Sequence, residues 1–186
     1  MELLKTAKKA PLAWRMRPQS LDEFVGQSHL IEKGRPLREA IESDSISSLI
    51  LYGPPGTGKT ALAHIIAGKT RAFFLTLNAV TSGIGDIKGA LKEARRADNA
   101  ILFIDEIHRF NKLQQDALLP DVENGVATLI GASTQNPFFS IIPALSSRSM
   151  IFQFFPLTVS EIKTLIGRAL KDSENGLGLS NIQLAK

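Results

Sequence analysis

Apolar residues along this chain follow two patterns, which alternate from about residue 36 onward. Short apolar runs, bounded by glycine, proline or polar residues, are typical of buried strands. Between them, apolar residues recur every three or four positions, as they do on the buried face of a helix. Strands are predicted at 49–52, 72–77, 100–104, 127–132 and 150–154. Helices are predicted at 36–43, 59–69, 84–94 and 112–119, with a short helix and turn at 21–31.

Strands that alternate with helices indicate βαβ units, and therefore a parallel sheet. The nearly continuous apolar character of the strands indicates burial on both faces, and right-handed crossovers place helices on both sides. The predicted fold class is thus a three-layer α/β domain around a parallel five-stranded sheet. Ligands of such open sheets bind at the carboxyl ends of the strands, so the chemistry is expected there.

Both ends of the chain depart from this alternation. The first 20 residues hold two prolines and little periodicity, which predicts an extended basic arm. Toward the other end, Thr158 and Glu161 form a T-x-x-E capping box, which predicts a helix to about Lys171. The expected division is an arm over 1–20, an α/β core over 21–156 and the beginning of a truncated helical lid over 157–186.

Composition narrows the class of protein. The chain has 186 residues, 44% of them hydrophobic and 22% charged, which is ordinary for a globular domain. It has no cysteine, which excludes disulfides and thiolate metal sites, and no apolar run of about 18 residues that predicts a membrane span. The net charge of +4 is too small to indicate a nucleic-acid binder by itself. The basic amino-terminal segment lacks the features of a signal peptide, so a cytoplasmic protein is expected.

A glycine-rich segment follows the first predicted strand and opens the next helix. Its sequence, GPPGTGKT, matches the phosphate-loop pattern G-x-x-x-x-G-K-[ST] in the strand–helix context that the pattern needs. Glycines let backbone N–H groups wrap a phosphate, and the helix amino terminus adds partial positive charge. Lys59 is expected to reach the β- and γ-phosphates of ATP, and the hydroxyl of Thr60 to ligate Mg²⁺. The nucleotide-binding residues predicted here are Gly53, Pro54, Pro55, Gly56, Thr57, Gly58, Lys59, Thr60 and Ala61.

Two carboxylates end the third predicted strand, whose sequence is ILFI followed by Asp105 and Glu106. An acidic pair alone is usually a solvated strand end, but this one comes 46 positions after the phosphate-loop lysine and follows a fully apolar strand. Asp105 is therefore expected to hold Mg²⁺ directly or through water. Glu106 is expected to orient and deprotonate the attacking water as general base.

GPPGTGKT and ILFIDE together resemble the AAA+ superfamily of P-loop ATPases. PLAWRMRPQSLDEFVGQSHL resembles the lead-in of its clamp-loader-like members. The strings IDEIHRFN, QQDALLP and IGA, with the following NP, resemble the RarA/MgsA family of replication-associated recombination proteins, which is related to the Werner-helicase-interacting protein. The resemblance covers residues 11 to about 170, and HRFN and QQDALLP are its most specific strings.

The resemblance implies the strand order 5-1-4-3-2 and several further roles. Thr134, with Asn136 as the alternative, matches the polar sensor that helps to position the water; a capping threonine is the structural alternative. Arg148 in LSSR resembles an arginine finger that reaches the γ-phosphate in a neighbouring subunit; a surface salt bridge is the alternative. The segment that resembles the lining of the adenine pocket is Val25, Gly26 and Gln27.

Other polar residues keep more than one interpretation. Asn78 either couples partner binding to Glu106 or simply ends a strand. The chain's three scattered histidines give no metal-ligand spacing, so His108 is not expected to bind metal. Arg109 pairs with an acidic neighbour, contacts another subunit or meets DNA. A basic helical face is either solvated or a nucleic-acid contact; its residues are Lys88, Lys92, Arg95 and Arg96.

The resulting hypothesis is a Mg²⁺-dependent ATPase with ATP and Mg²⁺ as ligands, working as a ring-like homo-oligomer. The resemblance implies stimulation by gapped, forked or single-stranded DNA, a single-stranded-DNA-binding protein as a possible partner, and a cytoplasmic, nucleoid-associated location without membrane contact. One alternative is a clamp-loader or branch-migration subunit, which HRFN and QQDALLP disfavour. The other is a non-hydrolysing ATP-binding assembly module, which Glu106 and Arg148 disfavour.

Overall fold

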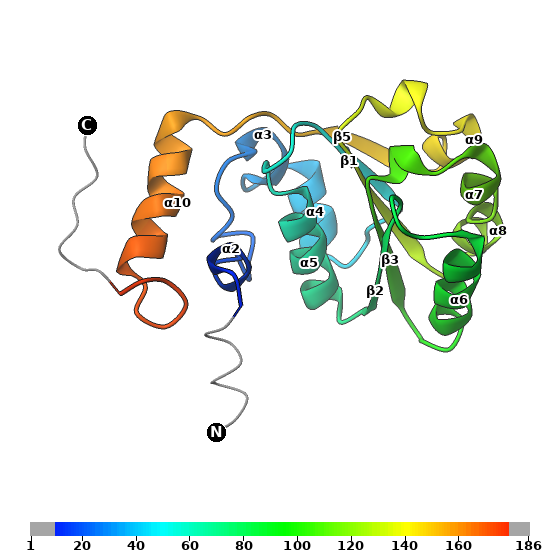
Figure 1. Cartoon of the computed structure of the whole chain (residues 1–186), viewed down its shortest axis with the longest axis horizontal. Coiled ribbons are helices and arrows are strands. Elements are labelled where there is room, and N and C mark those ends of the chain that lie inside the picture. The colour runs from blue at the N-terminus through cyan, green and yellow to red at the C-terminus, as the bar shows by residue number, and fades with distance from the viewer. Residues whose placement is uncertain (1–9, 179–186) are drawn as a thin grey trace. The chain divides into compact units, whose positions relative to one another are not determined.

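One parallel sheet of five strands forms the centre of the computed structural model, which describes residues 10–178 (Figure 1). The strands are β1 (Leu49–Tyr52), β2 (Phe73–Asn78), β3 (Ala100–Asp105), β4 (Thr128–Ser133) and β5 (Met150–Gln153). All four neighbouring pairs are parallel, in the order β2-β3-β4-β1-β5. The predicted α/β fold class and the strand order implied by the resemblance are confirmed, with strand ends shifted by at most one residue.

Helices cover both faces of this sheet (Figure 1). One face carries α3 (Ser28–Ile31), α4 (Pro36–Glu42) and α5 (Lys59–Thr70). The other carries α6 (Ile84–Ala94), α7 (Lys112–Asp116), α8 (Leu119–Glu123) and α9 (Pro143–Ser146). Strand side chains alternate between the two faces, so each apolar strand contributes to two layers of core. Leu102 and Ile104 pack with Ile87 on the α6 side, whereas Phe103 stacks on Phe74 with ring centres 6.0 Å apart.

The predicted helix over 112–119 is two shorter helices, α7 and α8. Pro120 lies in the first turn of α8 and has no N–H to donate to a preceding turn, so a continuous helix loses a hydrogen bond there. Two 3₁₀ turns, η1 (Ile107–Arg109) and η2 (Pro137–Phe139), and the four-residue α9 were not predicted. Elements this short carry no hydrophobic period for the sequence to reveal.

The chain divides into two compact units. One is Gln27–Pro156, which contains the whole sheet, and the other joins the residues up to Gly26 with those from Leu157 onward. The functional division at 20 and 156 remains a prediction. No helix among the described residues is long and apolar enough to cross a membrane.

The second unit holds α2 (Leu12–Arg15) and α10 (Val159–Lys171). The α2 turn corrects the prediction of an extended arm: the carbonyl of Pro11 accepts hydrogen bonds from the N–H groups of Trp14 and Arg15 at 2.9 and 3.1 Å. Residues 1–9 of that arm, and 179–186 at the other end, lie outside the described residues.

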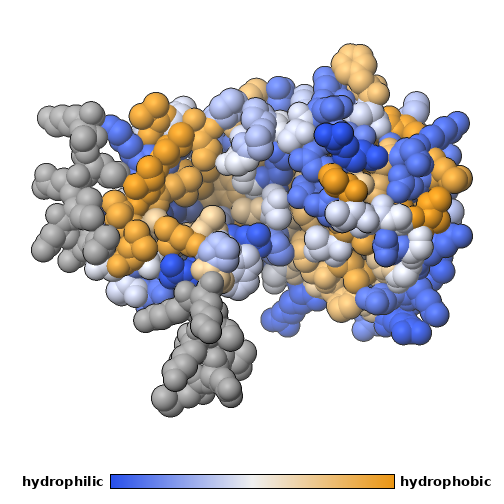
Figure 2. Space-filling model, viewed as in Figure 1, coloured by the Kyte–Doolittle hydropathy of each residue, from blue (hydrophilic) through white to orange (hydrophobic). Residues whose placement is uncertain are grey.

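The predicted capping box at the start of α10 is present. The N–H and the hydroxyl of Thr158 donate to Glu161 Oε2 at 2.6 and 2.9 Å, and these two contacts lower the pKa of the Glu161 carboxyl. The Glu161 N–H donates to the Thr158 hydroxyl oxygen at 3.3 Å. The helix exposes an apolar face, visible in orange in Figure 2. Its exposed apolar residues are Val159, Ile162, Leu165 and Ile166.

Candidate functional site

The phosphate loop joins the carboxyl end of β1 to the amino terminus of α5. Gly53, Gly56 and Gly58 have φ angles of 147°, 75° and 102°, which side-chain-bearing residues rarely adopt. A Cβ at Gly53 would lie 2.2 Å from the Phe154 carbonyl oxygen, so the loop leaves β1 tight against the end of β5. A Cβ at Gly56 would meet nothing within 4 Å, so this part of the loop borders open space. The loop therefore offers backbone N–H groups beside a helix amino terminus, which suits a phosphate.

Lys59 is buried, and its ammonium group lies inside the loop. Its Nζ donates to the carbonyls of Gly53 and Pro54, both at 2.8 Å. Two of the three N–H donors are thereby used, which leaves the third for a phosphate oxygen. Burial lowers the Lys59 pKa, while the negative charges of Glu106 and then Asp105 oppose that shift. These opposing charges show that β3 delivers both carboxylates to the vicinity of the loop.

Asp105 is the last residue of β3, and Glu106 follows it in the left-handed backbone conformation at φ 54°. The Glu106 N–H donates to Asp105 Oδ1 at 3.1 Å. Among the described residues there is no cluster of three or more histidine, cysteine, aspartate or glutamate side chains that could hold a metal by itself. A hydroxyl and one carboxylate fit Mg²⁺ bound to a nucleotide, because that ion takes most of its ligands from phosphates and water. The donor set of Thr60 and Asp105 thus fits nucleotide-bound Mg²⁺.

The end of β4 supplies the polar group that contacts Glu106. The hydroxyl of Thr134 donates to Glu106 Oε2 at 3.0 Å. Asn136, the alternative, caps η2 by accepting the Phe138 N–H at 3.0 Å. The structure therefore brings Thr134, and not Asn136, to the acidic pair.

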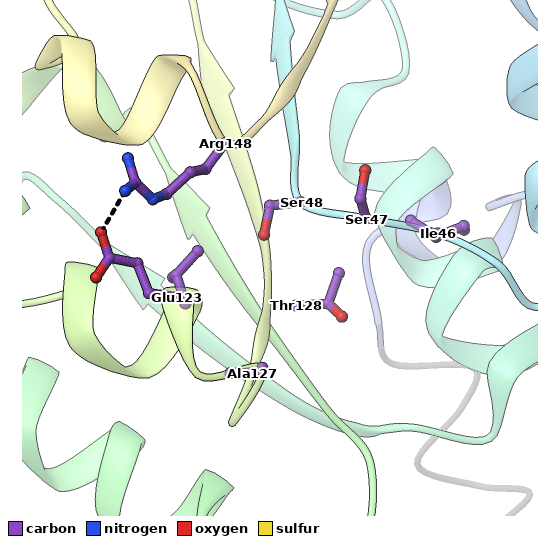
Figure 3. A pocket seen from close by; sticks show the side chains of 9 residues that line it. Ile46, Ser47, Ser48, Glu123, Ala127, Thr128 and Arg148 are labelled. Atoms are coloured by element: carbon purple, nitrogen blue, oxygen red, sulfur yellow. Dashed lines mark ion pairs between the residues drawn. The ribbon is translucent and has the colours of Figure 1, made fainter.

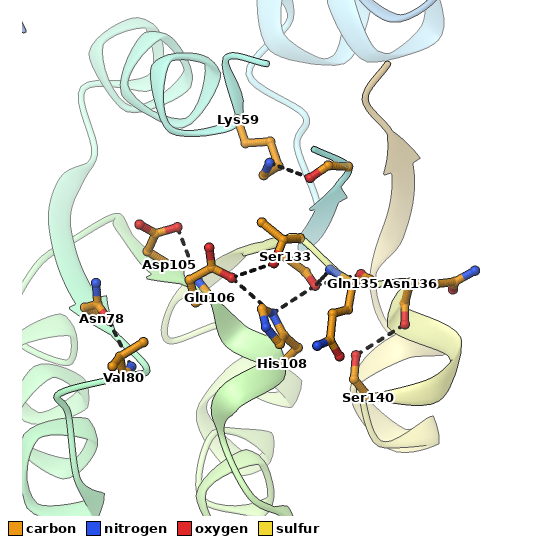
Figure 4. Close-up of polar contacts among 12 residues, drawn as sticks. Lys59, Asn78, Val80, Asp105, Glu106, His108, Ser133, Gln135, Asn136 and Ser140 are labelled. Carbon is orange, nitrogen blue, oxygen red and sulfur yellow. Dashed lines mark hydrogen bonds and ion pairs between the residues drawn. The ribbon is translucent and has the colours of Figure 1, made fainter. Parts of the chain in front are cut away.

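Two residues without a predicted role complete this polar cluster (Figure 4). His108 Nδ1 lies 3.3 Å from Glu106 Oε2 and 3.2 Å from the hydroxyl oxygen of Ser133. The side chain of His108 is 3% exposed, and burial lowers its pKa, with Glu106 opposing and Arg109 adding to the shift. The sequence held one signal for this contact: Ser133 ends β4 and His108 closely follows β3, its neighbour in the sheet.

Arg148 lies at the opposite edge of the sheet, where the strands begin (Figure 3). It pairs with Glu123 at 2.8 Å and donates to the Ala144 carbonyl at 3.0 Å. Both residues line a hollow of about 530 Å³, together with Ser48 just before β1 and Thr128 at the start of β4. The structure does not bring Arg148 to the phosphate loop of its own chain.

Of the predicted adenine-pocket segment, Gln27 belongs to the unit that holds the phosphate loop. Its buried side chain donates to the Phe155 carbonyl at 2.7 Å and to the Thr57 carbonyl at 3.5 Å, and it accepts the Phe155 N–H at 2.9 Å. Val25 and Gly26 belong to the other unit. The contribution of these three residues to a nucleotide pocket stays a prediction.

Asn78 and Arg95 make hydrogen bonds within their own chain. The Asn78 side chain accepts the Val80 N–H at 2.9 Å, which closes the turn after β2. Arg95 forms a two-point ion pair with the buried carboxylate of Asp121, at 2.7 and 2.9 Å, and so ties α6 to α8. Lys88, Lys92 and Arg96 are exposed.

Comparison with known proteins identifies the family. Residues 16–145 match the family model described as the Holliday junction DNA helicase RuvB P-loop domain. The chain is 49% identical over 94% of its length to replication-associated recombination protein A of Haemophilus influenzae, and 47% identical over 94% to that of Escherichia coli. It is 47% identical over 87% of its length to ATPase WRNIP1 of Dictyostelium discoideum. The chain spans 40% of the length of the two bacterial relatives and 19% of the third.

Solved structures agree with this assignment. The Holliday junction branch migration motor RuvB of Thermotoga maritima superposes with a TM-score of 0.72 at 35% identity, covering 84% of this chain and 54% of that one. Identity is therefore higher to the replication-associated recombination proteins than to RuvB, within a shared fold. The chain belongs to the AAA+ P-loop family of the RuvB ATPase domain, in the branch of replication-associated recombination protein A and WRNIP1.

Proposed function

We propose that this chain hydrolyses ATP with Mg²⁺ at the carboxyl edge of its sheet. The observation that carries the proposal is the Thr134–Glu106 contact at 3.0 Å. It holds a partly exposed carboxylate beside Asp105, close enough to Lys59 to influence its pKa. A general base must be held within reach of the water that it deprotonates, and this contact fixes Glu106 from a second strand.

Each residue has one role in the reaction. The loop N–H groups and Lys59 bind the β- and γ-phosphates, and Thr60 and Asp105 hold Mg²⁺, which neutralises charge on those phosphates. Glu106 takes a proton from the attacking water as the oxygen of that water forms a bond to the γ-phosphorus. The bond from that phosphorus to the bridging oxygen breaks, and ADP leaves with the electron pair.

Arg148 completes the site from a neighbouring copy in a ring-like homo-oligomer. It is half-exposed at the edge opposite to the loop, which suits contact with another subunit better than with its own phosphate loop. A guanidinium is always charged, so it stabilises the developing negative charge without a change of protonation. A module that only binds ATP has no chemical need for either Arg148 or Glu106.

The biological setting follows from the relatives' names. Two of them are replication-associated recombination proteins, so we assign the ATPase to recombination and repair at replication forks, with stimulation by gapped, forked or single-stranded DNA. We further propose a single-stranded-DNA-binding protein as a partner of this chain. We place the chain itself in the cytoplasm, at the nucleoid. The match to the RuvB P-loop domain favours a second candidate, a branch-migration motor. The lower identity to RuvB ranks it second.

The test measures phosphate release per subunit at rising protein concentration, with Mg²⁺ or a chelator, and with gapped DNA or a Holliday junction. Glu106→Gln is expected to lower kcat by about 10²–10⁴-fold while ATP binding persists, because the amide cannot accept the proton. If the unchanged protein binds ATP without hydrolysing it, and Glu106→Gln binds ATP equally well, the chain is an ATP-binding module. Stimulation by the junction alone supports the branch-migration candidate.

A further inference from the structure

The cluster around Glu106 contains a donor that the proposed mechanism does not yet use. His108 Nδ1 contacts Glu106 Oε2 at 3.3 Å and the Ser133 hydroxyl oxygen at 3.2 Å (Figure 4). Its side chain is only 3% exposed. A buried imidazole that touches the general base acts on the reaction through that base, so its protonation state and orientation matter.

The surrounding hydrogen bonds fix which imidazole nitrogen carries the proton. The Ser133 hydroxyl donates its single hydrogen to the Gln135 carbonyl at 2.7 Å and accepts the Gln135 N–H at 3.0 Å. One lone pair remains on that oxygen, so toward His108 it can only accept. The Glu106 carboxylate also only accepts. His108 therefore carries its proton on Nδ1, in the hydrogen bond with Ser133 and 3.3 Å from Oε2 of Glu106.

The backbone under His108 is held in place by packing. Ile107 is fully buried, and a Cβ at Gly131 would lie 3.0 Å from its Cδ1. Gly131 of β4 thus leaves the space that Ile107 fills, which docks η1 onto the strand that carries Ser133. This packing holds the backbone of η1, and the hydrogen bond to Ser133 holds the His108 side chain.

We propose that His108 is a positioning residue for hydrolysis: together with the Thr134 hydroxyl, its Nδ1–H holds Oε2 of Glu106 and leaves Oε1 to take the proton from water. Both donors reach the same oxygen, at 3.3 and 3.0 Å. Among the described residues, no hydrogen bond is made to Oε1. The carboxylate is therefore fixed in orientation while its other oxygen stays available, and this inference rests on the proposed ATPase function.

Three substitutions separate this role from a general packing role. Asparagine places its amide N–H near the position of Nδ1, whereas glutamine places it near Nε2. We expect His108→Ala and His108→Gln to lower kcat by about 10- to 100-fold, since a small misplacement of a catalytic group costs about that much. His108→Asn is expected to restore kcat to within a few-fold, with ATP affinity unchanged in all three. The matched control is His64→Asn, on exposed α5 surface against Phe74, which leaves kcat unchanged.

A second measurement does not depend on turnover. Nitrogen-15 NMR of the histidine side chains reports which imidazole nitrogen is protonated, and we expect Nδ1 for His108 at neutral pH. Protonation of Nε2 instead, or equal kcat for the Asn, Gln and Ala variants of an active protein, overturns this inference and leaves the ATPase proposal standing. Absence of hydrolysis by the unchanged protein overturns the ATPase proposal, and this inference with it.

Discussion

The two edges of the sheet carry charged residues held in different ways. At the carboxyl edge, Glu106 receives a hydrogen bond from Thr134 and lies 3.3 Å from His108, whose side chain is 3% exposed. At the opposite edge, Arg148 and Glu123 form an ion pair whose side chains are 45% and 42% exposed. A group that works within its own chain can be fixed by buried contacts. A group that must reach another molecule needs a partner that it can leave, and a solvated ion pair is such a partner.

Replacing Arg148 gives the sharpest test of this difference. Arg148→Ala is expected to lower kcat by about 10³–10⁵-fold, the range of arginine fingers elsewhere, while ATP affinity stays unchanged because no described phosphate-loop residue contacts Arg148. Steady-state hydrolysis and equilibrium nucleotide binding measure the two quantities. A loss of affinity equal to the loss of kcat means that Arg148 binds nucleotide within its own chain.

Mixing two inactive variants shows whether the finger acts between copies. Arg148→Ala subunits retain Glu106, and Glu106→Gln subunits retain Arg148. An interface that takes Glu106 from the first and Arg148 from the second is intact, so the mixture is expected to recover hydrolysis that neither variant has alone. Failure to recover activity, with assembly verified, contradicts a site shared between subunits.

The sequence predicted the carboxyl edge better than the opposite one, for a physical reason. Parallel strands bring their carboxyl ends to one edge, so a phosphate loop after β1, an acidic pair after β3 and a polar residue after β4 had to meet there. The contact of Thr134 with Glu106 follows from this rule. Glycines at 53, 56 and 58 likewise revealed a loop that needs positive φ angles.

Contacts that depend on individual rotamers and short turns were not predictable. The ion pair between Arg148 and Glu123 joins the segment after α9 to the end of α8, and neither of these short helices has a clear period. The placement of His108 depends on a three-residue 3₁₀ turn and on the space left by Gly131. Arg95 illustrates the same limit, because its pairing with buried Asp121 is invisible in a pattern that shows only a basic helical face.

Low pH is expected to destabilise the folded protein, because it favours protonation of His108. Burial lowers the folded-state pKa of His108 below its ordinary value of 6.5, so between these two pKa values the unfolded chain binds a proton that the folded chain does not. Stability is therefore lost as the pH falls through that window. The melting temperature is expected to fall more between about pH 7.5 and about pH 5.5 in the unchanged protein than in His108→Asn, which cannot titrate there. Equal falls contradict a buried, neutral His108.

Breaking the ion pair between Arg148 and Glu123 is expected to have the smallest effect on hydrolysis. Glu123→Gln removes a half-exposed ion pair worth about 0–1 kcal/mol, so the melting temperature should barely change. If Arg148 must leave Glu123 to reach a neighbouring phosphate, hydrolysis should rise by up to about fivefold, the equivalent of that energy. Glu93→Gln, on the exposed surface of α6, is the matched control for loss of one negative charge. A fall in hydrolysis specific to Glu123→Gln reverses the interpretation: the ion pair then orients Arg148 for its neighbour, and at both edges of the sheet the charged group is positioned by a contact within its own chain.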